Sequence, residues 1–317
     1  MKAPRDEIGN ALIALKKKGY PIVAIDSDLA SSTRTDQFQA VYPDAFFEMG
    51  IAEGSAMSFA TGQALEGNIP FYVNFAMFVT GTAWTQLRQA CYAKANIKLV
   101  GSHPGMDDGP DGASHHALED LALTRVLPGI TILTPADAEE VEAAFEQAIN
   151  IPGPVYIRVA REPMPVRDKS AVPRVTDIAA VEDSGNDFAI LYEGTVLEQA
   201  SAGYVQLCAQ GKRGKLIHVA MLKPFNRQRF LQLIASCPQI ATIENHTITG
   251  GLGGQVAEVL AEEGLTTRLI RLGTQDTFTE SGNSRQLKEN TVFRRPHSLT
   301  PSDSSGWQTA MRSAALK

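Results

Sequence analysis

The chain has 317 residues, of which 44% are hydrophobic and 20% are charged. This composition is that of a globular protein long enough for two domains, and it excludes wholesale disorder. The net charge of −6 argues against nucleic-acid binding, which needs a basic face, and no apolar run reaches the roughly 20 residues of a membrane span.

The N-terminal segment 1–20 has an amphipathic helical pattern with acids early and lysines late, which predicts a helix rather than a signal peptide. Three widely separated cysteines, Cys91, Cys208 and Cys237, fit neither a disulfide framework nor a zinc site. We therefore expect reduced cysteines and a cytoplasmic protein that binds neither nucleic acid nor a membrane.

Short aliphatic runs alternate with helical patterns through the first half of the chain. Strands are predicted at 22–26, 70–75, 97–102, 130–133 and 154–159, with helical periodicity at 50–67, 81–95 and 135–150. Thr134 suits the N-cap of the last of these helices, and Pro135 suits its first turn. Alternating strands and helices predict a mostly parallel sheet that is covered on both faces.

A stretch rich in proline and charge, 161–187, interrupts this alternation and has the composition of a linker. A second α/β pattern follows, with strands predicted at 188–193, 215–220, 240–244 and 267–272. The fold class is therefore α/β, with two open, mostly parallel-sheet domains at 1–163 and 187–317 and a linker at 164–186. The polar stretch after Asn290 is predicted to be a loosely held tail.

Three loops at the carboxyl ends of predicted strands are unusual, and ligands bind at these ends in such sheets. The first carries Glu53, although an acid near a helix N-terminus is common without any function. The second, 74–81, carries Phe75 and Phe78. The third, 102–116, concentrates three histidines and three aspartates. Their spacing matches no known set of metal ligands, so we expect these side chains to bind no metal.

These loops together resemble the thiamine-diphosphate enzymes of the transketolase family. The similar segments are GIAEG at 50–54, NFAMF at 74–78 and the pattern H-x7-D-G-x-x-H from His103 to His115. KPFN at 223–226 and the segment 242–260 are similar to the family's last domain. The resemblance spans roughly residues 5–290, and it implies a pyrimidine-binding domain followed by a transketolase C-terminal domain.

The resemblance implies how the chain would hold thiamine diphosphate. In this family the cofactor's own aminopyrimidine acts as the base, and a glutamate hydrogen-bonded to the ring nitrogen favours its imino form. Glu53 matches that glutamate, and Phe75 and Phe78 match the aromatic residues that stack on the pyrimidine. Single-chain relatives usually carry another aromatic residue where this chain has Gly81, and Trp84 lies one turn further on.

The resemblance also implies a set of substrate residues. His103, Asp111 and His115 match family positions that contact donor hydroxyls, the reacting oxygens and the sugar phosphate, and both histidines would be catalytic. Arg161 matches the family's phosphate-binding arginine, because a guanidinium fork pairs with phosphate oxygens. Arg5 and Ser32 match two further phosphate contacts.

Some positions differ from the family pattern or match it outside the catalytic set. Asp107 and Asp108 stand where relatives carry apolar or hydroxyl residues, and His116 stands where a glutamine is usual. These departures leave open which sugar the chain binds and whether that sugar carries a phosphate. Asp28 matches an acid at the family's subunit interface.

The chain has no glycine-aspartate-glycine segment followed about 30 residues later by asparagines, the pattern that supplies metal ligands beside the diphosphate. The run GGLGG at 250–254 precedes a helix and could bind an anion, but turn chemistry is the favoured interpretation. The resemblance therefore implies a partner, an N-terminal-section subunit, that holds the diphosphate with Mg²⁺ or Ca²⁺. The expected assembly is an α2β2 heterotetramer with a shared active site.

The expected function is that of a C-terminal-section subunit of a split transketolase, active only with its partner. It would transfer a two-carbon ketol unit from a ketose or ketose phosphate to an aldose or aldose phosphate. One alternative is a β-type subunit of a keto-acid dehydrogenase or of a deoxyxylulose-phosphate synthase-like enzyme. A keto-acid enzyme would not need His103, Asp111 and Arg161. A non-catalytic structural or regulatory subunit is the other alternative, which the retained Glu53 and phenylalanines disfavour.

Overall fold

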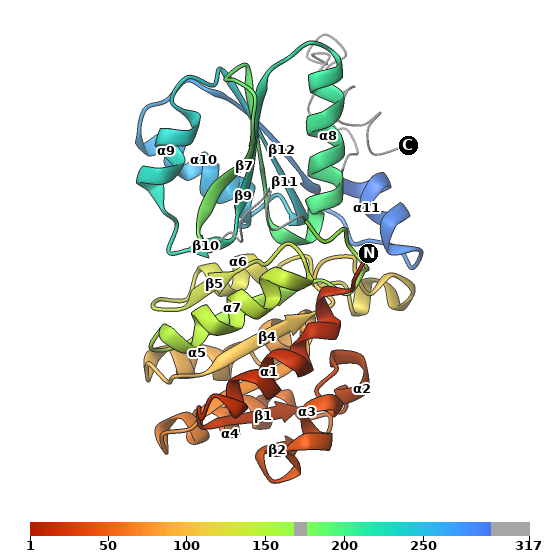
Figure 1. The fold of residues 1–317 in the computed structure, drawn as a ribbon, viewed down its shortest axis with the longest axis vertical. Helices are drawn as coiled ribbons and strands as arrows, with labels where there is room; N and C mark the ends of the chain where they lie inside the picture. The colour runs from red at the N-terminus through yellow and green to blue at the C-terminus, as the bar shows by residue number, and fades with distance from the viewer. Residues whose placement is uncertain (168–175, 293–317) are drawn as a thin grey trace.

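The computed structural model describes residues 1–167 and 176–292. They form two α/β domains, called the first and second layers, that follow one another along the long axis of the molecule (Figure 1). Apart from its first two residues, the tail predicted after Asn290 lies outside these ranges. Within them, no helix combines the length and the apolarity that crossing a membrane requires.

The first layer contains a seven-stranded sheet in the order β10-β5-β6-β4-β3-β1-β2. Its strands are β1 (Ile22–Asp26), β2 (Phe46–Glu48), β3 (Ile69–Phe75), β4 (Lys98–Ser102), β5 (Thr131–Leu133), β6 (Val155–Val159) and β10 (Met221–Lys223). All neighbours pair in parallel except β10, which runs antiparallel to β5. Every residue of β1, β4 and β6 is buried, as expected for parallel strands covered on both faces.

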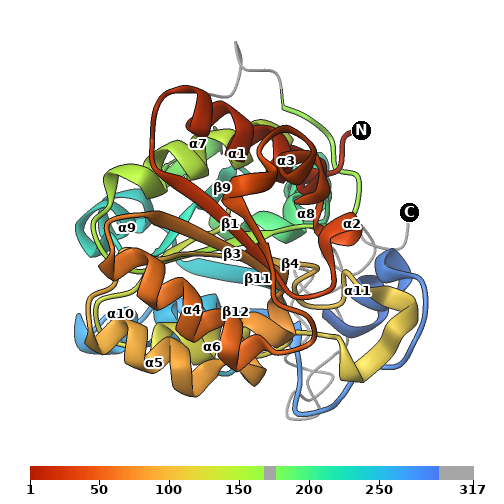
Figure 2. The same ribbon diagram turned by 90° about the horizontal axis from the view of Figure 1, so that it is seen from below.

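Helices cover both faces of this sheet (Figure 2). One face carries α1 (Ile8–Lys17), α3 (Asp36–Val41) and α7 (Ala138–Asn150), and the other carries α4 (Glu53–Leu65), α5 (Trp84–Tyr92) and α6 (Asp120–Arg125). The short elements are η1 (Pro4–Glu7), α2 (Ala30–Thr33), η2 (Pro43–Ala45), η3 (Phe78–Thr82) and η4 (Gly109–Ser114).

Helix α7 begins later than the sequence predicts, so the proposed cap at Thr134 and first-turn position of Pro135 are wrong. Asp137 is the N-cap, and its carboxylate accepts from the backbone N–H groups of Glu139 and Glu140, both at 3.0 Å. Thr134 instead donates its hydroxyl to the carbonyl of Val219 at 2.6 Å. Thr134 lies ahead of the helix start in the chain, and the Asp137 carboxylate takes the capping position instead.

The second layer contains a five-stranded sheet in the order β12-β11-β8-β9-β7. Its elements are β7 (Ile178–Asp183), β8 (Phe188–Tyr192), η5 (Gly194–Val196), α8 (Leu197–Ala209), β9 (Gly214–Val219), α9 (Arg227–Ile234), β11 (Gln239–Thr247), α10 (Leu252–Glu262), β12 (Arg268–Thr274) and α11 (Ser284–Val292). Only β7 runs antiparallel to its neighbour. The two-sheet α/β fold predicted from the sequence is confirmed.

Strand β7 lies inside the stretch predicted as a linker at 164–186, so that part of the prediction is wrong. β7 pairs with β9 at the edge of the second sheet. Its burial falls from Ile178 to the exposed pair Glu182 and Asp183. An edge strand with acids at its end lacks the continuous apolar pattern that marks the central strands.

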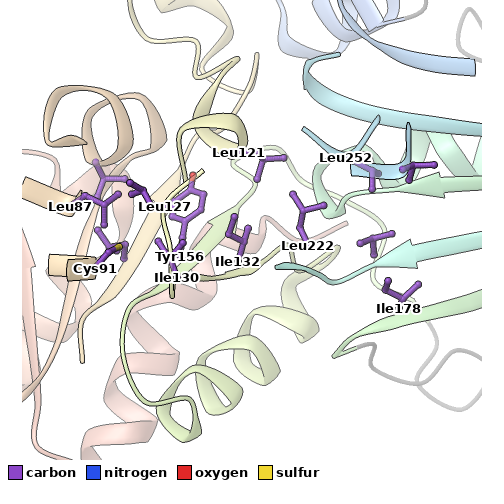
Figure 3. Close-up of a cluster of buried hydrophobic side chains, with 14 of the residues drawn as sticks. Leu87, Cys91, Leu121, Leu127, Ile130, Ile132, Tyr156, Ile178, Leu222 and Leu252 are labelled. Carbon is purple, nitrogen blue, oxygen red and sulfur yellow. The ribbon is translucent and has the colours of Figure 1, made fainter. Parts of the chain in front are cut away.

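The two layers share one apolar core (Figure 3). Leu121 and Ile132 of the first layer belong to the same buried cluster as Leu222 and Leu252, which follow the second layer's β9 in sequence. Strand β10, which carries Leu222, joins the first sheet directly. The chain therefore ties its second half to the first through both backbone pairing and side-chain packing.

A buried ionic network lies at the same junction. Arg158 on β6 pairs with Asp120 through Nε–Oδ2 at 2.8 Å and Nη2–Oδ1 at 3.1 Å, and its Nη1 lies 3.0 Å from Glu193 Oε2. All three side chains are fully buried. Although burial raises the pKa of Asp120, Arg158 holds it below its usual value. Removing one member would leave an uncompensated buried charge, so this network fixes the two layers together.

Candidate active site

Glu53 is the first residue of α4 and faces an open depression. This depression is lined by Ala52, Glu53, Gly54, Ser55, Ser58 and Gln86. Within the described ranges no hydrogen bond or ion pair engages the Glu53 carboxylate, which is half-buried. Its charge contributes, after burial, to raising the pKa of Tyr72 on β3 to about 12. The carboxylate is thus close to β3 and open to a ligand or to a second chain.

Phe75 and Phe78 form a stacked aromatic pair at the carboxyl end of β3. Their ring planes lie within 15° of parallel, with centroids 6.1 Å apart. Two histidines complete this aromatic cluster: His103 lies 4.1 Å from Phe75, and His115 meets Phe78 edge-on at 5.3 Å. The structure therefore brings together four of the predicted residues, which come from two separate sequence motifs.

His103 is held in one orientation. Its backbone is left-handed, with φ of 57°. Arg5 Nη1 lies 3.1 Å from His103 Nε2, and Ser102 Oγ lies 2.8 Å from Nδ1. Because a guanidinium can only donate, Nε2 accepts, and the ring proton sits on Nδ1 and points at the serine hydroxyl.

Burial, and then the charges of Arg5 and Arg161, lower the pKa of His103 to about 2. The imidazole is therefore neutral at neutral pH. An imidazole that stays neutral near pH 7 suits ligand binding better than the proton shuttling that the sequence allowed.

Basic side chains surround His103. The Nη1 of Arg5 donates to the carbonyl of Ser32 at 3.3 Å, so Ser32 contributes its backbone rather than its hydroxyl. Burial, then the neighbouring Arg34 and Arg161, lower the pKa of Arg5. Its buried Nε has no hydrogen-bond partner among the described residues. Cations that disfavour one another and an unpaired buried N–H together favour the binding of an anion.

Arg161 follows β6, and its side chain contacts the loop that follows β4. Its Nη1 lies 3.4 Å from the carbonyl of Asp107 and 3.2 Å from that of Asp108, and 3.7 Å from Asp108 Oδ1. Asp108 is buried, and this burial followed by the charge of Asp111 raises its pKa to about 7. The carboxylate oxygens of Asp108 and Asp111 and a ring nitrogen of His115, atoms of the kind that ligate metals, lie within 4.8 Å of one another. Asp108 therefore lies among the predicted site residues. In the sequence it is marked only by its difference from the family pattern.

Two other predicted positions lie apart from this group. His116 is buried, and its Nδ1 lies 2.5 Å from the hydroxyl of Thr279, so it points into the second half of the chain. Asp28 is exposed with φ of 62°, and its backbone N–H donates to Glu48 Oε1 at 2.8 Å. The same oxygen accepts from Gly50 at 2.9 Å, which shapes the turn before Glu53. The interface role of Asp28 stays a prediction.

The run GGLGG has a structural role. Glu244 accepts hydrogen bonds from the backbone N–H groups of Leu252 at 2.7 Å and Gly253 at 2.9 Å, the first residues of α10. A Cβ at Gly251 would lie 2.1 Å from Glu244 Oε2. The helix N-terminus is therefore occupied by the chain's own carboxylate, which supports the turn interpretation.

Comparison with known proteins places this chain in a family. The family model for the transketolase pyrimidine binding domain matches residues 2–166, and that for the transketolase C-terminal domain matches residues 178–297. A putative transketolase C-terminal section of Methanocaldococcus jannaschii is 34% identical over 294 residues, which cover 90% of each chain. A 6-deoxy-6-sulfo-D-fructose transketolase subunit of a Clostridium species is 32% identical, over 93% of this chain and 94% of that one.

A solved chain described as a split gene transketolase, inactive beta4 tetramer, is similar over its whole length. Its TM-score is 0.84 at 35% identity, and the match covers 100% of this chain and 99% of the other. By contrast, the chain spans only 46% of a 30% identical 1-deoxy-D-xylulose-5-phosphate synthase of Thermomicrobium roseum. Both family models match in chain order and together span most of the sequence, so this chain belongs to the transketolase family.

Proposed function

We propose that the chain is the C-terminal-section subunit of a split transketolase. With a partner, it transfers a two-carbon ketol unit from a ketose donor to an aldose acceptor. The observation that carries this proposal is the convergence of Phe75, Phe78, His103 and His115 in one aromatic cluster beside two arginines. A keto-acid dehydrogenase would not need the additional set of sugar contacts formed by His103, Asp111 and Arg161.

The described residues fit the pyrimidine end of thiamine diphosphate. When bound, this cofactor supplies a nucleophilic carbon that can carry the two-carbon unit. Glu53 would hold the proton at the ring nitrogen, because its carboxylate is open and unpaired within the described ranges. Phe75 and Phe78 would hold the ring by stacking. We propose that the partner, an N-terminal-section subunit, holds the diphosphate and its Mg²⁺ or Ca²⁺.

The substrate is proposed to be a sugar with a terminal anionic group. Arg5, Arg161 and neutral His103 would bind that group, and Asp111 and His115 would contact hydroxyls and the reacting oxygens. Phosphate and sulfonate both fit this chemistry. Relatives named for 6-deoxy-6-sulfo-D-fructose and for apulose-4-phosphate support an anionic sugar without choosing between the two.

The proposed assembly is a cytoplasmic α2β2 heterotetramer with a shared active site. Support comes from the open side of Glu53 and from the similar solved chain, which is described as inactive in its β4 form. Calorimetric titration of thiamine diphosphate with Mg²⁺ tests the division of the site. Tight, Mg²⁺-dependent binding is expected only for the two-chain complex, and equally tight binding by this chain alone would contradict the proposal.

The reaction is tested by assaying the two-chain complex with a panel of ketose donors and aldose acceptors, each with and without a phosphate or sulfonate. Ketol transfer is the expected activity. A deoxyxylulose-phosphate synthase-like reaction is the second candidate, favoured by relatives of that name at 30–31% identity. Consumption of pyruvate in place of a ketose would select it, and a complex inactive with every donor would point to a non-catalytic subunit.

A further inference from the structure

Asp107 is a buried carboxylate that links the loop at 102–116 to the second half of the chain. Its Oδ2 accepts from the backbone N–H of Arg161 at 3.0 Å. Its Oδ1 accepts from Asn245 Nδ2 on β11 at 3.1 Å and pairs with Lys288 Nζ on α11. Asp107 is fully buried and Lys288 is 4% exposed. A buried carboxylate needs such partners, and two of the three come from the second layer.

Asn245 also sets the path of the loop before Asp107. Its Oδ1 accepts from the N–H of Met106 at 2.9 Å, and its Nδ2 donates to the carbonyl of Pro104 at 3.1 Å. Gly105 lies between them with φ of 60°, and a Cβ there would come within 2.2 Å of Asn245 Cγ. The loop therefore follows the contour of one side chain of the second layer.

The arginine proposed to bind the substrate anion depends on this loop. Its Nη1 donates to the carbonyls of Asp107 and Asp108. Lys288 compensates the charge of Asp107, and Asn245 donates a hydrogen bond to the same carboxylate. Without these partners the Asp107 carboxylate would compete with the substrate anion for the Arg161 guanidinium, because it already accepts a hydrogen bond from the Arg161 backbone N–H.

We propose that Asn245 and Lys288 are positioning residues for Arg161. They hold Asp107 in place and neutralise it, so that the Arg161 guanidinium is presented to the substrate anion. The C-terminal half of the chain thereby sets the affinity for the anionic end of the substrate. This inference rests on the proposed function, in which Arg161 contacts that anion.

The test uses the two-chain enzyme and a matched pair of aldose acceptors, one with a phosphate and one without. Lys288→Met should raise KM for the phosphorylated acceptor by roughly 3-fold to 100-fold and leave KM for the other nearly unchanged. Asn245→Ala should act in the same direction. Arg285→Met is the matched control, because Arg285 lies on the same helix, is 60% exposed and pairs with Glu198 and Glu289.

A double-mutant cycle separates positioning from mere stability. In the Arg161→Ala background, Lys288→Met should add no further rise in KM, since no guanidinium is left to misplace. Lys288→Arg, which keeps a cation, should restore most of the discrimination. Equal rises for both acceptors, or full additivity with Arg161→Ala, would overturn the inference even if melting temperatures fall.

The inference and the proposed function fail in different ways. If Arg161→Ala affects both acceptors equally while ketol transfer continues, the anion role of Arg161 and this inference are both wrong, but the reaction stands. If the parent complex transfers no ketol unit from any donor, the proposed function itself is wrong. Should Lys288→Met not fold, Asn245→Ala gives the same comparison from a different element.

Discussion

Two acidic side chains at the candidate site, Glu53 and Asp108, differ in their surroundings. Glu53 begins α4 beside an open depression, whereas Asp108 is 3% exposed and lies beside Asp111 and Arg161. A carboxylate at an open helix start can accept a hydrogen bond from a donor group of a ligand. A buried carboxyl beside a like charge is driven toward its neutral form. The two acids therefore suit different tasks: Glu53 the proposed contact with the cofactor, and Asp108 the charge balance of the loop at 102–116.

The role of Glu53 predicts a large kinetic effect without a loss of stability. Glu53→Gln should lower turnover of the two-chain enzyme by roughly 10²–10⁴-fold, because the amide cannot take up the ring proton. The melting temperature should stay unchanged, since the described structure shows no bond to this carboxylate. Glu66→Gln, at the exposed end of the same helix, is the control. Near-parental turnover would make Glu53 an ordinary helix-terminal acid.

Asp108 predicts a pH dependence of stability. Burial, then Asp111, raise its pKa from 3.8 to about 7. A carboxyl with a raised pKa contributes stability that is full below its unfolded value and is lost as the pH rises through the folded value. The free energy of unfolding should therefore fall as the pH rises from 3.8 through about 7.

Asp108→Asn should remove part of that fall, because the amide does not ionise and keeps the shape of the side chain. Urea unfolding at several pH values measures the effect, with the exposed Asp44→Asn as control. The charged groups that face Asp108 are Asp107, Asp111 and Arg161, and all three are kept in the variant. A slope identical to that of the parent would contradict the prediction.

At the scale of elements, local capping and strand ends decide where the site residues point. Glu244 accepts hydrogen bonds from the first N–H groups of helix α10, and Glu48 holds the turn before α4. The segment after Phe75 winds as the π-helical η3, a geometry that is rare and often found at functional sites. Phe78 is the first residue of η3, and its ring meets His115 edge-on.

The cap of α7 can be tested by two substitutions. Asp137→Ala should lower the free energy of unfolding by about 0.5–2 kcal/mol, because two N–H groups lose their acceptor. The loss of the Arg167 ion pair at 3.0 Å adds to this. Asp137→Asn keeps a capping oxygen and should cost less. Denaturant unfolding compares the two, and equal losses would show that the ion pair, not the cap, dominates.

At the scale of the whole molecule, the two layers behave as parts of one body. The shared apolar cluster, strand β10 and the Arg158 network all cross between them. The Asp107 linkage crosses at the same junction and reaches the site. A substitution in one layer should therefore affect the other.

Leu222 tests this coupling, because it is fully buried on the strand that joins the layers. Leu222→Ala should lower the free energy of unfolding by about 2–5 kcal/mol. Unfolding followed by circular dichroism and by fluorescence should still give one coincident transition. Val205→Ala, at a position 64% exposed, is the control. Separate transitions for the two probes would mean that the layers fold independently.

The sequence by itself determined the fold class, most strands and the residues of the aromatic cluster. Each predicted strand overlaps an observed one, because apolar runs flanked by turns are local signals. The sequence pattern did not predict strands β2, β7 and β10, because short or edge strands bury too few residues to give such a pattern. Motif spacing likewise identified His103 and His115, although it said nothing of their distances from the phenylalanines.

Only the tertiary structure decided which groups share a charge environment. The low pKa of His103 comes from burial and from arginines far away in the chain, and Asp107 meets Asn245 across 138 positions. Such contacts depend on how two layers pack, which no local pattern encodes, because electrostatic interactions act through space and are strengthened by burial. The sequence therefore supplied the candidate residues, and the packing of the C-terminal half decided which groups surround Arg161.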